Sequence, residues 1–433
     1  MRMYDIIRKK RDGDALSAEE IRFFTEGIVD GSIPDYQAAA LCMAIYLNGM
    51  NREEIAQLTF AIRDSGERLD LSAISGIRAD KHSTGGVGDK TSLVVAPAVA
   101  SFGIKVAKVS GRGLAHTGGT VDKLESIPGF RTNLSDSEFI DCVNNVGAAI
   151  IGQTRDVAPA DKKLYALRDV TATVDTLPLI VSSIMGKKLA ADDDIIILDV
   201  KCGSGSFNKT PQISRELAQC MVDIGKKAGK KMLALITDMD RPLGCAIGNA
   251  LEVIEAIETM KGRGPEDFTR LCEVLISNTL YLAGKGSRQD CDDMAKASLS
   301  DGSALEKFRE MIIAQGGDPL VIDDYDRFGK AKYSHAVLAP KSAYISSVNA
   351  EGYGEASLIL GAGRNTMEES IDPCAGIILK KNTGDFVKEG EEIAVLYSED
   401  KEKFADSEKK LLSSTCFSSE APKKKPLILD MVE

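Results

Sequence analysis

An apolar run near the middle of the chain, Ile195–Val200, constrains the fold most. It reads Ile-Ile-Ile-Leu-Asp-Val and leads directly into Cys-Gly-Ser-Gly. A short apolar run closed by a glycine turn is typical of a strand buried on both faces. Comparable β-rich runs occur at residues 93–100, 105–109, 148–152 and 232–237. Because they alternate with glycine loops and helical segments, they predict an α/β domain with a largely parallel sheet.

Helical signals dominate the first 65 or so residues. Ser17 and Glu20 form a capping box ahead of an amphipathic run, and Asn51 and Glu54 repeat the pattern. A further helix is expected between Pro34 and Gly49, and others at about 266–284, 287–299 and 304–315. The N-terminal stretch therefore reads as a small helical unit.

Residues 161–191 also look helical, with Pro178 as an interruption, so this segment can return to the first helical unit. Both domains would then be discontinuous. The expected fold is α/β, with a small mostly helical domain and a larger α/β domain. The boundaries that we expect are 1–65 and 163–193 for the helical domain, 66–162 and 194–330 for the α/β domain, and 331–433 for a C-terminal barrel-like α+β domain.

The last hundred residues are strand-rich and contain a hairpin turn, Gly384–Gly390, like those of biotinyl and lipoyl carrier domains. A carrier displays a modifiable lysine on a tight turn, often beside methionine. Lys380 and Lys381 lie nearby without that setting, so the pattern favours a structural barrel over a carrier.

Composition excludes several classes of function. The net charge of −11 is spread along the 433 residues, which argues against nucleic-acid binding. No apolar run approaches the roughly 18 residues that a membrane span needs. The nine cysteines form no C-x-x-C pair, which argues against a zinc site or a disulfide framework and favours the reducing cytoplasm.

Two glycine-rich loops dominate the chemistry, KHSTGGVGDKTS at 81–92 and SGRGLAHTGGT at 110–120. Glycines let backbone N–H groups converge on an anion, and hydroxyl and ammonium groups add donors. Neither loop has the spacing of a Walker motif or a dinucleotide fingerprint. The residues suited to a phosphate cradle are Lys81, Ser83, Ser92, Lys108, Ser110 and Thr120.

The chain has three histidines, and His82 and His116 lie in these loops. His82 stands inside a loop suited to an anion and can be read as a structural or a functional residue, whereas His116 reads as a packing residue and His335 has no suggestive neighbours. From pattern alone, Arg168 and Lys187 read as surface charges on helices.

Taken together in order, these segments resemble the thymidine and pyrimidine-nucleoside phosphorylase family. The motifs are KHSTGGVGDK-TS, SGRGLAHTGGT-DKLESIPGF, KKLYALRDVTATVD, SSIMGKKLA and LDVKCGSGSF. The resemblance covers essentially the whole chain. It implies a homodimer that uses inorganic phosphate as co-substrate and no organic cofactor.

The resemblance also implies a cleft that separates the small helical domain from the larger α/β domain, with the site divided between the two. Phosphate would bind on the α/β side, at Lys81, His82, Ser83, Ser92, Lys108, Val109, Ser110 and Thr120. The base would bind from the helical side, at Arg168, Ser183, Ile184 and Lys187. Phosphate would attack the anomeric carbon while Arg168 and Lys187 stabilise the charge on the leaving pyrimidine, and His82 would act as general acid.

A potassium site is implied as well, at Gly88, Lys90, Leu243, Ala246 and Glu255. Most of its ligands would be backbone carbonyls. Lys90 departs from the threonine that some relatives have at this position.

Two alternatives remain open from the sequence. A strict thymidine phosphorylase would run the same chemistry on a narrower substrate. Lys108 argues for the broader range, because members that accept both uridine and thymidine usually have lysine there. An anthranilate phosphoribosyltransferase-like enzyme would need magnesium chemistry, but the acidic run at 192–194 reads as a solvated turn.

Overall fold

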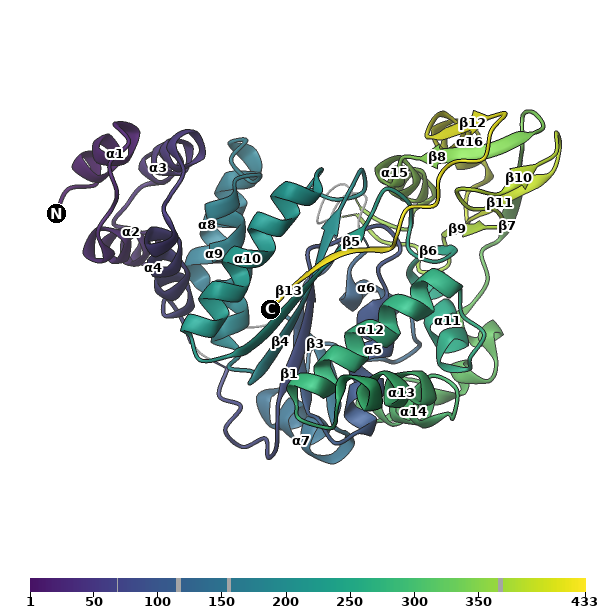
Figure 1. The fold of residues 1–433 in the computed structure, drawn as a ribbon, viewed down its shortest axis with the longest axis horizontal. Coiled ribbons are helices and arrows are strands. Elements are labelled where there is room, and N and C mark those ends of the chain that lie inside the picture. Colours follow the sequence, from purple (N-terminus) through teal and green to yellow (C-terminus); the bar gives the residue numbers. More distant parts are fainter. Residues whose placement is uncertain (68, 114–117, 154–156, 365–368) are drawn as a thin grey trace.

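The protein is described by a computed structural model that covers residues 1–67, 69–113, 118–153, 157–364 and 369–433. A helical unit, a larger α/β part and a strand-rich C-terminal part follow one another across the molecule (Figure 1). The α/β fold class is therefore confirmed. In the described segments, every helix is too short or too polar to cross a bilayer.

Six helices form the helical unit and share one apolar core. They are α1 (Met3–Arg11), α2 (Ala18–Asp30), α3 (Asp35–Asn48), α4 (Arg52–Arg63), α8 (Pro159–Val170) and α9 (Leu177–Ala190). Both predicted capping boxes are present, at Ser17 with Glu20 and at Asn51 with Glu54. Pro178 lies in the first turn of α9, where proline is tolerated because no helical N–H is lost.

The central sheet has the strand order β1-β4-β5-β13. Its strands are β1 (Ala79–Ser83), β4 (Ile195–Cys202), β5 (Lys231–Asp238) and β13 (Ile428–Val432). The first three are parallel, as the sequence predicted, and β13 runs antiparallel to β5. The end of the chain thus returns to the central sheet (Figure 1), a feature that sequence reasoning missed.

The apolar run of β4 is explained by helices on both faces of the sheet. Ile195 and Ile197 face one core, whereas Ile196 and Leu198 face the other. The first core is built largely by α5 (Thr91–Ser101), α6 (Thr120–Glu125), α11 (Asn249–Met260), α12 (Glu266–Leu282), α13 (Arg288–Ser298) and α14 (Ser303–Ala314). The second is built by α4, α9 and α10 (Pro211–Lys227).

One expected strand is wrong. Residues 93–100 lie inside the helix α5, with all eight buried. A helix enclosed on every side is apolar all round and loses its helical periodicity, so a short segment of it reads like a buried strand. The three expected helices between 266 and 315 are confirmed as α12, α13 and α14.

A second parallel pair, β2 (Val106–Ser110) and β3 (Ala148–Gly152), lies beside β1. A bridge between Arg78 and Lys105 connects this pair to the start of β1. The helix α7 (Asp136–Val146) packs against β3. The carboxyl ends of β1 and β2 consequently point toward the same region.

Two further sheets, of orders β10-β8-β12 and β6-β9-β11-β7, are built by the C-terminal part, and the second also includes β6 from the α/β part. Their strands are β6 (Ala246–Gly248), β7 (Tyr333–Leu338), β8 (Ala343–Val348), β9 (Gly376–Leu379), β10 (Phe386–Val387), β11 (Glu392–Ser398) and β12 (Thr415–Ser418). The helical elements here and before them are η1 (Pro319–Ile322), η2 (Tyr325–Phe328), α15 (Ala350–Leu360), η3 (Lys401–Lys403) and α16 (Phe404–Ser413). A barrel-like closure is not confirmed.

Candidate active site

The predicted phosphate residues gather where β1 and β2 end. Lys81, His82 and Ser83 close β1, and Lys108, Val109 and Ser110 close β2. Ser92 lies in the first turn of α5, and Thr120 begins α6. A helix N-terminus presents free N–H groups and a partial positive charge, so the α5 end favours an anion. His116 lies outside the described residues.

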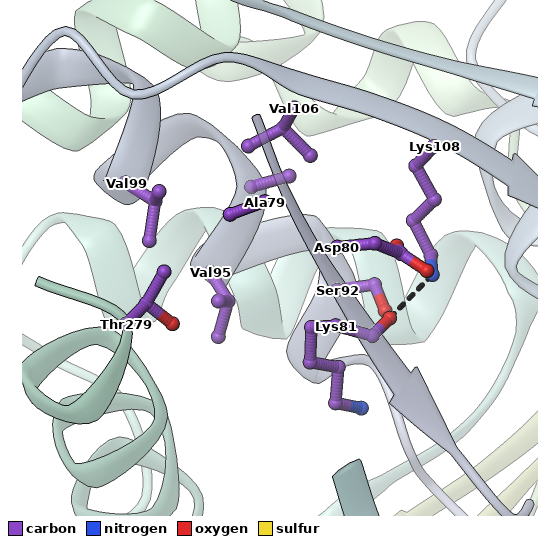
Figure 2. Close-up of a pocket in the computed structure, with 10 residues that line it drawn as sticks. Ala79, Asp80, Lys81, Ser92, Val95, Val99, Val106, Lys108 and Thr279 are labelled. Carbon is purple, nitrogen blue, oxygen red and sulfur yellow. Dashed lines mark hydrogen bonds and ion pairs between the residues drawn. The ribbon is translucent and has the colours of Figure 1, made fainter. Parts of the chain in front are cut away.

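A small pocket adjoins this region and is polar at one end (Figure 2). Lys81, Ser92 and Lys108 contribute to the polar end, and Val95 and Val99 of α5 are among the residues that line the other end. The pocket shows that the two lysines from different strands line one space.

Asp80 is held between two buried lysines. Lys108 Nζ donates to Asp80 Oδ1 at 3.1 Å, and Lys188 Nζ lies 2.7 Å from Asp80 Oδ2. Burial alone would raise the pKa of Asp80, but the two ammonium groups hold it well below its usual range. At Lys108 the effect of burial is larger than the attraction of the Asp80 carboxylate. The pKa of the Lys108 ammonium is therefore lowered to about 8.

Lys81 belongs to a second buried ionic group beside the first. Its Nζ donates to Thr91 Oγ1 at 2.5 Å and lies 3.6 Å from both Asp89 and Asp199. Lys201 pairs with Asp199 at 2.7 Å. Although burial opposes ionisation, Lys81 and Lys201 hold the pKa of Asp89 well below its usual range. These contacts hold Lys81 Nζ in place at the end of β1.

His82 is half-buried between these charged groups. Burial, and then repulsion from Lys188 and Lys108, lowers the pKa of the imidazole well below its ordinary value. The ring is therefore neutral at neutral pH before any anion arrives. A bound phosphate dianion next to His82 would raise this pKa again.

On the helical side, Ser183 and Lys187 lie one turn apart on α9. Lys187 Nζ donates to Ser183 Oγ at 2.9 Å and forms an ion pair with Asp161 of α8. Ile184 lies on the same helix and is partly exposed. Lys187 keeps 31% of its side chain exposed, so it can reach a ligand.

Arg168 differs from expectation. An open setting was predicted, but the residue is only 2% exposed. Its guanidinium donates to the carbonyls of Thr173 at 3.2 Å, Val174 at 2.5 Å and Leu179 at 3.1 Å. These bonds tie down the connection between α8 and α9, because a planar fork of donors can hold several carbonyls at once.

The five predicted cation-site residues do come together, but Lys90 lies among the other ligands. Lys90 Nζ is 3.0 Å from the carbonyl of Leu243, 2.9 Å from that of Ala246, and ion-paired with Glu255. A Cβ atom added at Gly88 would lie 2.7 Å from the Leu243 carbonyl, so the backbone is close-packed there. The oxygens that would bind potassium are engaged by an ammonium group, and the residues do not fit the ion.

Several residues of the site were missed from sequence. Asp80 and Lys188 adjoin predicted residues in the chain, and strand and helix geometry could have suggested them. The run 192–194 was read as solvated, yet Asp193 is buried. Burial and the nearby Asp80 carboxylate raise the pKa of Asp193 well above its usual value.

A helical bundle joined to an α/β part is the domain arrangement of the glycosyl transferase family, and the chain matches the models of both of its domains. Residues 4–66 match the model of the glycosyl transferase family helical bundle domain, and residues 75–305 match that of its a/b domain. Residues 344–417 match the pyrimidine nucleoside phosphorylase C-terminal domain.

Full-length relatives narrow the assignment. The chain is 53% identical over 433 residues to the pyrimidine-nucleoside phosphorylase of Geobacillus stearothermophilus, covering 100% of both. It is 53% identical over 402 residues to that of Bacillus subtilis, covering 92% of both. It is 51% identical over 415 residues to that of Staphylococcus aureus strain N315, covering 96% of both. The chain belongs to the pyrimidine-nucleoside phosphorylase family.

A solved structure agrees at the level of fold. The anthranilate phosphoribosyltransferase of Thermus thermophilus superposes with a TM-score of 0.59 at 19% identity, covering 71% of this chain and 98% of that one. At this identity the likeness shows the fold alone.

Proposed function

We propose that the protein catalyses the reversible phosphorolysis of pyrimidine nucleosides, including uridine, thymidine and deoxyuridine. The products are the free base and ribose 1-phosphate or 2-deoxyribose 1-phosphate. The observation that carries the proposal is the pair of lysines, Lys81 and Lys108, that line one pocket at the ends of β1 and β2. Relatives that share half of the sequence along the whole chain support the same reaction.

Phosphate binds, in this proposal, among Lys81, Ser83, Ser92, Lys108, Ser110 and Thr120, with the backbone of His82 and Val109 alongside. The lysines neutralise the dianion, and the hydroxyls and the α5 N-terminus donate hydrogen bonds. Before phosphate enters, the Asp80 carboxylate offsets part of the positive charge of the site, because it pairs with Lys108 and Lys188.

The pyrimidine is bound by Ser183, Ile184 and Lys187 of α9 and by Arg168 of α8. Negative charge grows on the ring as the bond to the sugar breaks, and Lys187 stabilises it. Arg168 uses one donor from each of its three nitrogens on carbonyls. Two of its five N–H groups remain, one on each terminal nitrogen, and these can face the base.

His82 supplies the proton in this scheme. Its depressed pKa makes the imidazole neutral in the free enzyme. Binding of the phosphate dianion raises the pKa, and the imidazolium can then donate to a base oxygen as the base departs. Water is excluded when the helical and α/β sides close, which favours phosphate as the nucleophile.

The domain division proposed from sequence goes with this scheme: 1–65 and 163–193 on the base side, 66–162 and 194–330 on the phosphate side, and 331–433 as the C-terminal part. We also propose cytoplasmic location and a homodimer. Apolar side chains exposed on α1 and α3 support the dimer, namely Tyr4, Tyr36, Met43, Tyr46 and Leu47. Light scattering of Leu47→Glu, which should be more monomeric than the wild type, tests this face.

The test of function is phosphate-dependent release of uracil and thymine from a panel of nucleosides. Cleavage of thymidine without uridine would indicate the strict thymidine phosphorylase instead. Magnesium-dependent consumption of phosphoribosyl pyrophosphate, without phosphorolysis, would overturn the proposal in favour of a phosphoribosyltransferase.

A further inference from the structure

Lys90 is almost completely buried, yet its ammonium group has a full set of partners. Nζ donates to the carbonyl oxygens of Leu243 and Ala246 and to the carboxylate of Glu255. The Phe268 ring lies 5.2 Å from Nζ and adds a cation–π contact. Three acceptors for three N–H donors is the full capacity of a lysine.

Glu255 supplies the negative charge that faces the Lys90 amino group. Glu255 also accepts the backbone N–H groups of Cys245 at 2.9 Å and Ala246 at 3.1 Å. One carboxylate therefore holds both the ammonium and the turn that supplies the carbonyls.

The ammonium group occupies the centre of an oxygen cage. Two backbone carbonyls and a carboxylate are hard oxygen ligands, the kind that a hydrated alkali cation exchanges its water for. Here all three face a positive charge that is covalently attached to the chain. A potassium ion at the same position would have to displace Nζ and leave a buried, unpaired ammonium, which is costly.

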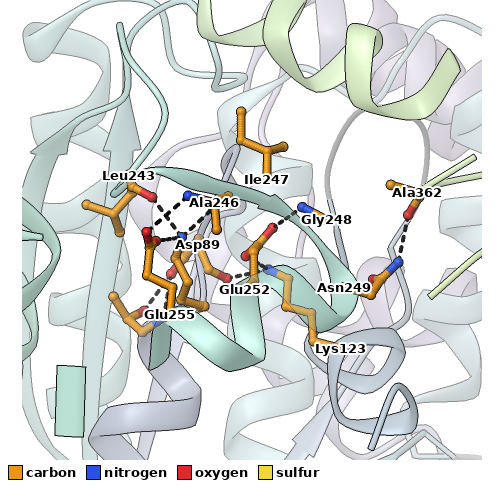
Figure 3. A network of polar contacts seen from close by, with 12 residues as sticks. Asp89, Lys123, Leu243, Ala246, Ile247, Gly248, Asn249, Glu252, Glu255 and Ala362 are labelled. Atoms are coloured by element: carbon orange, nitrogen blue, oxygen red, sulfur yellow. Dashed lines mark hydrogen bonds and ion pairs between the residues drawn. The ribbon is translucent and has the colours of Figure 1, made fainter. Parts of the chain in front are cut away.

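This contact fixes the loop that precedes α5. Lys90 is the residue before Thr91, where α5 begins, and Thr91 bonds Lys81. A second ammonium, Lys123 of α6, donates to the backbone carbonyl of Asp89 at 2.7 Å and pairs with Glu252 at 2.7 Å. Glu252 and Glu255 lie one turn apart on α11, and Figure 3 shows Lys123 beside Glu252 and the Leu243 and Ala246 backbone near Glu255.

We propose that the Lys90 ammonium is a built-in replacement for a bound monovalent cation, so that this protein positions its phosphate loop without potassium. Lys90 is a positioning residue: it acts on phosphate through the 81–92 loop and the start of α5. The kinetic part of the inference rests on the proposed phosphorolysis. The cation part does not, because it predicts how folding stability responds to salt.

The experiment compares the wild type with Lys90→Thr at constant ionic strength, in potassium chloride and in tetramethylammonium chloride. Melting temperature and the KM for phosphate are measured in each. The wild type should give the same values in both salts. Lys90→Thr offers a hydroxyl to the vacated cage, so its melting temperature should rise with potassium concentration, as expected for a ligand that binds only the folded state.

The KM for phosphate should distinguish Lys90→Thr from the wild type in the same way as the melting temperature does. In tetramethylammonium, Lys90→Thr should have a KM for phosphate raised about 10-fold or more, since small displacements of a binding loop are expensive, and potassium should restore it. Two controls are available. Lys90→Met removes the charge without offering an oxygen, and Lys123→Thr removes an ammonium that bonds one carbonyl only; neither should be rescued by potassium.

A saturable potassium effect on the melting temperature or KM of the wild type would overturn the proposal. So would a Lys90→Thr variant that potassium fails to stabilise, including one that remains unfolded in both salts. A variant that folds only with potassium would support it. If the wild type lacks phosphorolysis but the melting temperatures behave as stated, the proposed function is wrong. The proposal that the Lys90 ammonium replaces a bound cation is then still supported.

Discussion

The Nζ atom of Lys108, on β2, donates to Oδ1 of Asp80, on β1, across 3.1 Å. The same ammonium also donates to the backbone carbonyl of Lys81 at 2.5 Å. One contact thus joins the two strands whose ends form the proposed phosphate site. Because burial brings the Lys108 pKa to about 8, its charge is sensitive to pH in the working range of an enzyme.

The KM for phosphate should rise as pH increases past about 8, by about tenfold per pH unit, because Lys108 then loses its proton and stops attracting the anion. The measurement is a pH profile of kcat/KM for phosphate. Asp80→Asn serves as the comparison: Asp80 raises the Lys108 pKa, so its removal should shift the alkaline limb to lower pH. If the alkaline limb does not shift in Asp80→Asn, the ionisation that it reports belongs to a group other than Lys108.

Lys108→Met should lower uridine cleavage more than thymidine cleavage. An ammonium can donate to a ribose 2′-hydroxyl, directly or through water, whereas methionine leaves the hydroxyl poorly solvated. The difference in kcat/KM should be about 10-fold or more, and wild-type values for the two nucleosides should lie within roughly 10²-fold. Lys188→Met, which removes the other partner of Asp80, should affect both substrates alike. Equal losses for Lys108→Met would limit Lys108 to binding phosphate.

His82→Ala should reduce kcat by roughly 10² while leaving the KM for phosphate nearly unchanged, because a general acid acts only as the base leaves. His335 provides a matched control. It lies in the C-terminal part, where its Nε2 is 2.9 Å from Glu408, so His335→Ala should keep normal turnover. Near wild-type turnover in His82→Ala would remove this histidine from the mechanism.

Arg168→Ala should destabilise the fold, contrary to what an open setting would predict. It removes the donors to three backbone carbonyls, at a cost of about 2–4 kcal/mol in the free energy of unfolding. Urea denaturation measures this. Arg270→Ala is the control, since Arg270 forms an exposed pair with Glu273 and should change stability by less than about 0.5 kcal/mol. A fully stable Arg168→Ala would show that these bonds contribute little.

Lys187→Ala should remain folded and lose on the order of 10²–10³ in kcat/KM, because its ammonium faces charge that develops on the base. Steady-state kinetics with thymidine and a melting curve check both parts. Lys227→Ala, at an exposed pair with Glu53, should alter neither. Unimpaired catalysis in Lys187→Ala would show that this lysine only pairs with Asp161 and does not act on the base.

Local signals in the sequence were sufficient for much of the fold. The capping boxes at Ser17 and Asn51 depend on residues three positions apart, so the sequence states them directly. The apolar run of β4 requires cover on both faces, which a parallel sheet between helices provides. The glycine loops and their lysines likewise predict a phosphate site, because backbone N–H and ammonium groups favour an anion, and that site stays a prediction.

Other features were decided by contacts between distant segments. The helix α5 was mistaken for a strand because burial on every side removed its periodicity. The C-terminal strand β13 pairs with β5, about two hundred residues earlier in the chain. The sequence of residues 428–432 does not indicate which strand they pair with. Arg168 was expected in the open because its pattern showed a charge but not the carbonyls that surround it.

Lys90 shows most clearly the difference between what the sequence determines and what the tertiary structure decides. The sequence by itself determined that a lysine stands among residues that resemble cation ligands. Only the tertiary structure decided what that lysine does, because its partners Leu243, Ala246 and Glu255 lie more than 150 positions away. A buried charge is tolerable only where folding brings acceptors to it, and the position of those acceptors is a property of the packed chain as a whole.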